Sequence, residues 1–224
     1  PPVAAFSVSS PLCEKKVITF TNSSTSSEGS LVGWTWDFGD GTPLVLQNNG
    51  NPVTHTYAQW GDYDVKLNVT TSNGCVSTAA VTRIHVNPIP RPNFTIPASV
   101  CLPNANAVFT NTSSIPDNTQ SGFTYYWDFG DPPSGVVNNS TATNPSHTYV
   151  TTGPYNVNLQ VTSAAGCIQD TTIILNTIHP QPLADFVVDK DEVCLGDAIR
   201  FTDNSNQLGG TATSWNWDLA NGDT

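Results

Sequence analysis

The chain has 224 residues, a length that allows one domain or two. Its formal net charge is −11 and only 11% of its residues are charged, which excludes the strongly basic surface of a nucleic-acid-binding protein. No apolar run is long enough to predict a membrane-spanning helix, and no signal peptide is recognisable. Because methionine is absent, we expect a segment of a longer, processed polypeptide.

The composition favours an all-β fold. Thr, Ser, Asn, Val, Gly and Pro are abundant, whereas Lys, Glu, Leu and Arg are scarce. The abundant residues are typical of strands and turns, and the scarce ones are good helix formers. No window shows a sustained helical period.

Taken in chain order, the first strand signals are a Phe-Thr-Asn step at 20–22 and an alternation of bulky residues over 34–38. Val65, Leu67 and Val69 then alternate with polar residues, which predicts a strand with one buried face. Asp-Gly and Asn-Gly turn signals separate these segments. We therefore expect the bulky residues of the strands to meet in a core between two sheets.

The same series of signals recurs along the chain. The motif Trp-Asp-Phe-Gly-Asp at 36–40 returns at 127–131 and in part at 217–219, and His-Thr-Tyr at 55–57 returns at 147–149. The interval is about 90 residues, which fits one β-sandwich domain and is too long for a solenoid unit.

We predict three segments with proline-rich boundaries. Residues 1–88 and 89–180 would each form a complete β-sandwich, and 181–224 would form the N-terminal part of a third. About seven antiparallel strands per sandwich would place the two ends of each domain at opposite poles. Tandem immunoglobulin-like sandwiches would then follow one another as extended beads on a string.

Five cysteines follow the same repeat. Cys13 and Cys75 fall in the first segment, and Cys101 and Cys167 fall in the second, so the simplest prediction is one disulfide within each domain. The partner expected for Cys194 would lie beyond residue 224. Each bond would stabilise its domain by about 4 kcal/mol in the chain-entropy model and would persist in an oxidising compartment. Free thiols are the alternative, and the spacing does not fit a zinc site.

These motifs together resemble the PKD (polycystic kidney disease) domain family, which is marked by W-x-W-D-F-G-D-G, then H-x-Y, then G-x-Y-x-V-x-L-x-V. The third segment matches only Trp215-x-Trp217-Asp218. The matching stretches in the other two segments are 34–41, 55–57 and 61–69, and 127–131, 147–149 and 153–161.

The resemblance implies an extracellular β-sandwich without catalytic activity. The cysteine-bearing version of the motifs is similar to tandem arrays in bacterial surface proteins, among them large gliding adhesins of Bacteroidota that are exported by type IX secretion. PKD modules also accompany secreted proteases, chitinases and other polysaccharide hydrolases.

Three functions follow as hypotheses. The leading one is a non-enzymatic spacer, stalk or adhesive module of a large, cell-surface or extracellular protein. The alternatives are an accessory substrate- or carbohydrate-binding module of a secreted hydrolase, and a subunit of a surface filament or secretion complex. The expected partners are other domains of the same protein and a surface glycan or protein ligand, with neither nucleic acid nor membrane insertion.

The candidate catalytic groups have simpler structural explanations. Asp-Phe-Gly at 37–39 is also a kinase motif, but the other kinase motifs do not accompany it. Phe38 is expected to pack inward, and Asp37 to accept backbone N–H groups of the following turn. No nucleophile motif accompanies His55 or His147, so we expect packed or hydrogen-bonded structural histidines. No catalytic residue is predicted.

Two weaker binding hypotheses remain. Asp37, Asp40, Asp62 and Asp64 are candidate ligands for calcium, which some PKD domains bind, although the EF-hand spacing is absent. The alternative is that these aspartates form turns and are solvated, and no other cofactor is expected. Trp60 lies outside the strand pattern, where an exposed ring would stack on a sugar or on a neighbouring domain. The second repeat has no aromatic residue there, which argues against that role.

Overall fold

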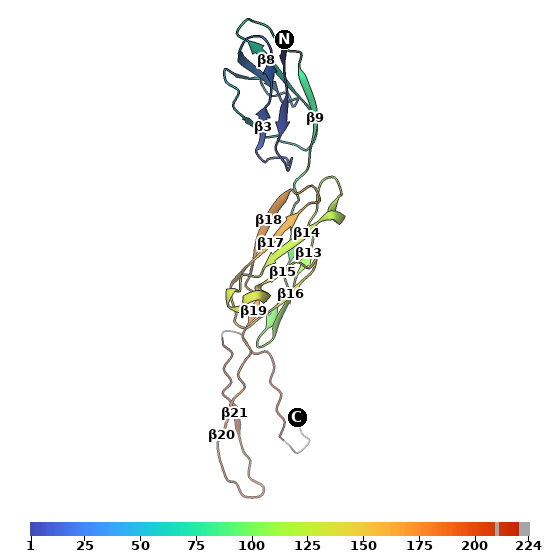
Figure 1. The fold of residues 1–224 in the computed structure, drawn as a ribbon. Coiled ribbons are helices and arrows are strands. Elements are labelled where there is room, and N and C mark those ends of the chain that lie inside the picture. Colours follow the sequence, from blue (N-terminus) through green and yellow to red (C-terminus); the bar gives the residue numbers. More distant parts are fainter. Residues whose placement is uncertain (209–210, 220–224) are drawn as a thin grey trace. The chain divides into compact units, whose positions relative to one another are not determined.

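The computed structural model describes residues 1–208 and 211–219. In this part of the chain the regular structure consists of β-strands and two short 3-10 segments, so the all-β prediction is confirmed (Figure 1). Each of the first two repeats builds its own set of sheets, which are antiparallel except for one parallel strand pair in the second repeat.

Two facing sheets form the first repeat. The smaller sheet has the order β2-β3-β7 and the larger one the order β6-β5-β8-β9, while β1 and β4 form a separate ribbon. All neighbouring strands are antiparallel. The strands are β1 Pro2–Val3, β2 Phe6–Val8, β3 Ile18–Asn22, β4 Thr25–Ser26, β5 Leu31–Asp37, β6 Val45–Gln47, β7 Val53–His55, β8 Gly61–Thr71 and β9 Ala80–Val86.

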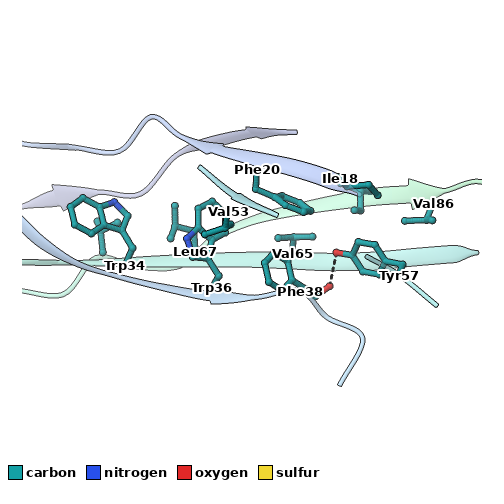
Figure 2. Close-up of a cluster of buried hydrophobic side chains, with 12 residues drawn as sticks. Ile18, Phe20, Trp34, Trp36, Phe38, Val53, Tyr57, Val65, Leu67 and Val86 are labelled. Carbon is teal, nitrogen blue, oxygen red and sulfur yellow. Dashed lines mark hydrogen bonds between the residues drawn. The ribbon is translucent and has the colours of Figure 1, made fainter. Parts of the chain in front are cut away.

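The core of the first repeat lies between these sheets, as the alternating pattern predicted. Trp36 of β5 is opposite Leu67 of β8, and both side chains are fully buried. Phe20 of β3 packs over them from the other sheet, with its ring centroid 6.0 Å from that of Trp36. Figure 2 shows side chains from both sheets meeting in this layer. Burial of such large rings supplies most of the hydrophobic stabilisation of the repeat.

The second repeat has a similar arrangement. Its larger sheet has the order β15-β14-β17-β18, and three strand pairs complete it: β10-β13, β12-β16 and the parallel pair β11-β19. The elements are β10 Phe94–Thr95, β11 Val100–Cys101, β12 Ala105–Val108, β13 Thr110–Asn111, η1 Gln120–Gly122, β14 Thr124–Asp128, η2 Pro132–Asn138, β15 Asn139–Ser140, β16 Ser146–Tyr149, β17 Tyr155–Thr162, β18 Ile168–Leu175 and β19 Ile178–His179.

The third segment contains the first hairpin of the same design. β20 (Phe186–Val188) pairs antiparallel with β21 (Phe201–Asp203). Phe186 is opposite Asp203, just as Phe6 is opposite Asn22 in the first repeat. Trp217 packs edge-on against Phe186 with ring centroids 5.5 Å apart. A cleft of about 630 Å³ opens beside these rings.

Candidate functional site

The Asp-Phe-Gly segment of each repeat forms a tight turn. Asp37 accepts a hydrogen bond from the Gly39 N–H at 3.0 Å, and Asp128 accepts one from the Gly130 N–H at 2.9 Å. Both glycines have positive φ, and a Cβ on Gly39 would lie 2.6 Å from the carbonyl oxygen of Asp64. Only glycine fits this position without a shift of the backbone. The predicted turn role of Asp37 is confirmed.

A histidine–aspartate pair closes each turn. His55 Nε2 lies 2.7 Å from Asp40 Oδ2, and the imidazole stacks on Phe38 with ring centroids 4.1 Å apart. In the second repeat His147 Nε2 lies 3.0 Å from Asp131 Oδ2. The prediction of hydrogen-bonded structural histidines is therefore confirmed in both repeats.

A buried tyrosine ties the same histidine segment to the turn. Tyr57 donates its hydroxyl hydrogen to the carbonyl oxygen of Phe38 at 3.0 Å, shown by the dashed line in Figure 2. Tyr149 makes the equivalent bond to Phe129 at 2.9 Å. Burial, with the nearby carboxylates adding to it, strongly raises the pKa of both phenols. We call the aspartate, histidine and tyrosine, with the turn they hold, the clasp of each repeat.

The electrostatics of the first clasp favour an ionised Asp40. Burial acts to raise the pKa of this carboxyl group, but hydrogen bonds from Thr42 and His55 outweigh it and leave the pKa below its ordinary value. The carboxylate thus accepts bonds on both oxygens, from Thr42 on Oδ1 and from His55 on Oδ2. The clasp is a closed hydrogen-bonded cluster that fixes a turn.

A second tyrosine in each repeat forms a corner contact four residues along the chain. Tyr63 donates its hydroxyl hydrogen to the carbonyl of Gln59 at 2.9 Å, and Tyr155 does the same to the carbonyl of Thr151 at 3.3 Å. Each bond spans four residues and anchors the start of the long strand, β8 or β17.

The four candidate calcium ligands are not gathered into one site. Asp37 and Asp40 are engaged in the turn and the clasp, whereas Asp62 bonds to Arg83 and His85 on β9. The hydrogen bond from His85, and then that from Arg83, lowers the pKa of Asp62. Within residues 1–208 and 211–219, no group of three or more His, Cys, Asp or Glu side chains could hold a metal ion.

Trp60 is part of a contact that sequence reasoning missed. Trp60 is 41% exposed, as predicted, and its backbone N–H donates to Oε2 of Glu14 at 3.2 Å. The other oxygen of Glu14 accepts the N–H of Ile89 at 3.2 Å. Glu14 is 7% exposed and ties the Trp60 turn to the proline-rich segment after β9. The second repeat has Leu102 instead, so repetition could not reveal this role.

The disulfide prediction is wrong in its pairing. Cys13 is bonded to Cys167, with the two Cα atoms 5.8 Å apart, whereas Cys75, Cys101 and Cys194 are free and exposed. The predicted bonds Cys13–Cys75 and Cys101–Cys167 are therefore absent. The bond that forms joins the first sequence repeat to the second. It lies within one compact unit, whose parts are Pro1–Asn93, Thr112–Tyr126 and Leu159–Thr171.

The β8–β9 hairpin explains why Cys13 and Cys75 do not meet. Cys13 bridges to Asn87, just after the end of β9, where Val86 is opposite Gly61 at the start of β8. Cys75 lies in the turn at the other end of the hairpin, where its carbonyl accepts the N–H of Thr71. Because β8 has 11 residues, these positions are separated by roughly 35 Å along the strand.

The turn, the clasp and the long alternating strand recur together in both repeats, and they are the motifs of one family. The family model for the PKD domain matches residues 1–86 and 87–177. The chain therefore belongs to the PKD domain family. PKD domains are generally non-catalytic modules and occur in extracellular or secreted proteins.

Two curated relatives are bacterial collagenases. A stretch of 70 residues, 31% of this chain, is 36% identical to 6% of collagenase ColA of Clostridium perfringens. A stretch of 66 residues, 29% of the chain, is 41% identical to 8% of the microbial collagenase of Vibrio alginolyticus. The matched stretches thus span less than a tenth of either relative.

Similar solved structures include PKD and fibronectin-type sandwiches. The PKD1 domain of the Vibrio cholerae metalloprotease PrtV is 29% identical, over 38% of this chain and 95% of that domain, with a TM-score of 0.33. Fibronectin(III)-like modules of Clostridium thermocellum CbhA are 16% identical, over 78% of this chain and 93% of theirs, with a TM-score of 0.37. In the described part of the chain, no helix is both long and apolar enough to cross a membrane.

Proposed function

We propose that the chain is a non-catalytic spacer or stalk segment of a large extracellular protein. The observation that carries this proposal is the Cys13–Cys167 disulfide, which closes a loop with a sequence separation of 154 residues across two repeats. A covalent bond of this kind protects the enclosed chain from extension when the protein is pulled from its ends. The side chains that most resemble catalytic groups, the histidine–aspartate pairs, are used inside the clasps instead.

Single-molecule pulling of the chain from its two ends tests the mechanical role. In the oxidised protein, the residues between Cys13 and Cys167 should not lengthen the unfolded chain. Reduction, or Cys13→Ser, should release about 500 Å of additional extension, since 154 residues each span roughly 3.4 Å when stretched. Cys75→Ser is the matched control and should leave the extension of the oxidised protein unchanged. Equal extension before and after reduction would contradict the proposal.

We further infer that the parent is a bacterial surface protein, such as a gliding adhesin exported by type IX secretion. Tandem PKD repeats that each carry a cysteine before the second core strand support this inference. Antibodies against residues 1–224 should label intact, unpermeabilised cells of the source organism. Labelling only after lysis would contradict it.

A second function, substrate binding beside a hydrolase, is favoured by the collagenase relatives and by the exposed ring of Trp60. Co-sedimentation with insoluble collagen or chitin would distinguish it from a plain spacer. Tyr126 is 48% exposed and serves as the matched control. Binding that is lost in Trp60→Ala and kept in Tyr126→Ala would support the accessory module. The spacer proposal expects no sedimentation of any of these proteins.

The absence of catalysis is tested directly on the same preparations. We expect no turnover of casein, collagen or chitin by residues 1–224. Turnover that disappears in His55→Gln or His147→Gln, while circular dichroism shows a folded chain, would overturn the non-catalytic assignment.

A further inference from the structure

The cysteines fall into two structural types. The first type, here called the entry cysteine, precedes the second core strand of its repeat: Cys13, Cys101 and Cys194. The second type, here called the turn cysteine, follows glycine in the hairpin turn after the long strand: Cys75 and Cys167. The one disulfide of the described chain joins an entry cysteine to the turn cysteine of the next repeat. The other three cysteines, Cys75, Cys101 and Cys194, form no disulfide and are called the open cysteines below.

The open entry cysteine Cys101 has the same backbone setting as the bonded Cys13. Cys13 forms a parallel bridge with Asn87, and the following residue, Glu14, donates its N–H to the carbonyl of Asn87 at 2.9 Å. Cys101 forms the same parallel pairing with His179, whose carbonyl accepts the N–H of Leu102 at 3.0 Å. Both entry cysteines therefore lie beside the segment that leaves their own repeat.

The turn cysteines match as closely. The Cys167 carbonyl accepts the Ser163 N–H at 2.9 Å, and its N–H donates to the Ser163 hydroxyl at 3.2 Å. Cys75 makes both bonds to Thr71, at the same two distances. The open turn cysteine is thus already in the conformation of the bonded one.

Exposure separates the bonded from the open cysteines. Cys13 and Cys167 are 2% and 1% exposed, whereas the three open cysteines are exposed. In an oxidising compartment an exposed thiolate is accessible to thiol–disulfide exchange. Each open cysteine is therefore available for bonding, and the observed bond gives the pattern of an entry cysteine with a turn cysteine.

We propose that Cys75, Cys101 and Cys194 are covalent docking sites for further PKD repeats, joined by the same rule as Cys13–Cys167. Cys75 takes the entry cysteine of another repeat, and Cys101 and Cys194 take turn cysteines. The partner is a PKD repeat, and a second copy of this chain supplies both types. These disulfide bonds would link successive repeats covalently into a continuous series. The proposal rests on the observed bond and on the proposed extracellular location, and it does not depend on the spacer role.

The bond-forming step is thiol–disulfide exchange with a small disulfide as the oxidant. One protein thiolate attacks oxidised glutathione and releases a glutathione thiolate, which leaves a mixed disulfide. The second protein thiolate then attacks that mixed disulfide and releases the second glutathione. Two protein thiols are oxidised to one disulfide, and one oxidised glutathione is reduced to two thiols.

Two differently tagged copies of the full chain test the rule. The entry variant, Cys75→Ser, keeps Cys101 and Cys194 as its open thiols. The turn variant, Cys101→Ser with Cys194→Ser, keeps only Cys75. Both retain the Cys13–Cys167 bond. Each is incubated with oxidised and reduced glutathione, alone and mixed in equal amounts, and dimers are resolved by non-reducing electrophoresis and located by mass spectrometry of bridged peptides.

The rule predicts covalent dimers only in the mixture, with peptides that join Cys75 of one copy to Cys101 or Cys194 of the other. Indiscriminate oxidation would leave about half of the dimers in the mixture as homodimers, and each variant alone would also dimerise. Either that distribution or the absence of dimers in the mixture would overturn the proposal. A mass map of the unmodified chain that shows Cys13 bonded to Cys75 would also overturn it, whatever the pulling experiment shows.

Discussion

In the first repeat the side chains of His55 and Asp40 keep 14% and 13% of their surface exposed, whereas His147 and Asp131 in the second repeat keep only 3% and 6%. The segment after the turn makes the difference. In the second repeat η2 follows Asp131 directly, and its last residue, Asn138, accepts the Asp131 N–H and donates to Asp128. The same motif can therefore be partly open or fully enclosed, depending on the loop that follows it.

The central tryptophan of each core also differs between the repeats, in the hydrogen bonding of its indole N–H group. Trp127 donates its indole N–H to the carbonyl of Ala142 at 2.9 Å. The equivalent Trp36 is equally buried, and its indole nitrogen has no hydrogen-bond partner in the described chain. The second repeat thus satisfies a buried polar group that the first repeat leaves unsatisfied, which costs the first repeat stability.

Among equivalent positions of the two repeats, the entry cysteines should differ most in the stability lost on substitution. Cys13→Ser opens the loop to Cys167 and should lower the free energy of unfolding by about 5 kcal/mol in the chain-entropy model. Cys101→Ser removes no bond within the chain and should change the free energy of unfolding by less than about 0.5 kcal/mol. Hydrogen exchange of peptides from each repeat, measured without reductant, checks both values. Equal destabilisation by the two variants would contradict the observed pairing.

The next largest difference should be at the clasps. Asp131→Ala leaves the buried His147 without its partner and should destabilise the second repeat by about 3 kcal/mol. Asp40→Ala should cost the first repeat about 1 kcal/mol, because water can reach His55 and replace the lost bond. Hydrogen exchange resolves the two repeats within the same chain. A larger effect at Asp40 would show that η2 does not enclose the second clasp.

Much of this architecture is predictable from the sequence because its determinants are local. The period-two alternation over β8 fixes which side chains face the core, and Asp-Phe-Gly fixes the turn that holds Asp37. The aspartate–histidine pair of the clasp could also have been predicted from the sequence. Asp40 and His55 both have counterparts one repeat later, whereas Asp62 and Asp64 do not, and this joint recurrence distinguishes the clasp from a calcium site.

The cysteine pairing was not predictable from the same information. Repetition shows which residues are equivalent, but an entry cysteine can bond to the turn cysteine of its own repeat or of the next one, and the same repeated positions are compatible with both pairings. The decision depends on the ends of the β8–β9 hairpin, since Cys75 and Asn87 lie at opposite ends of it. Glu14 was missed for a related reason, because its two partners are backbone N–H groups, which leave no trace in the sequence.

The tryptophan comparison predicts a smaller difference. Trp36→Phe and Trp127→Phe remove similar volumes from similar cores, so their cavity costs should nearly cancel. Only Trp127→Phe also removes a hydrogen bond and leaves the Ala142 carbonyl without that donor, which should add about 1 kcal/mol. Hydrogen exchange of each repeat measures the two costs. Equal costs would show that the Trp127 bond contributes nothing.

The smallest expected effect concerns acid. The pKa of Asp40 is lower in the folded chain than its ordinary value of 3.8, so this group contributes stability above about pH 4 that is lost as the pH falls through the folded pKa. The contribution should be modest because the clasp of the first repeat is partly open to water. Asp40→Asn should therefore lower the melting temperature near pH 6 and have the same melting temperature as the unmodified protein near pH 2.

Thr42→Val, which removes one hydroxyl donor to the same carboxylate, should give a smaller change in melting temperature with the same pH dependence. A difference between Asp40→Asn and the unmodified protein that persists undiminished at pH 2 would show that the substitution acts through packing rather than through the charge of Asp40.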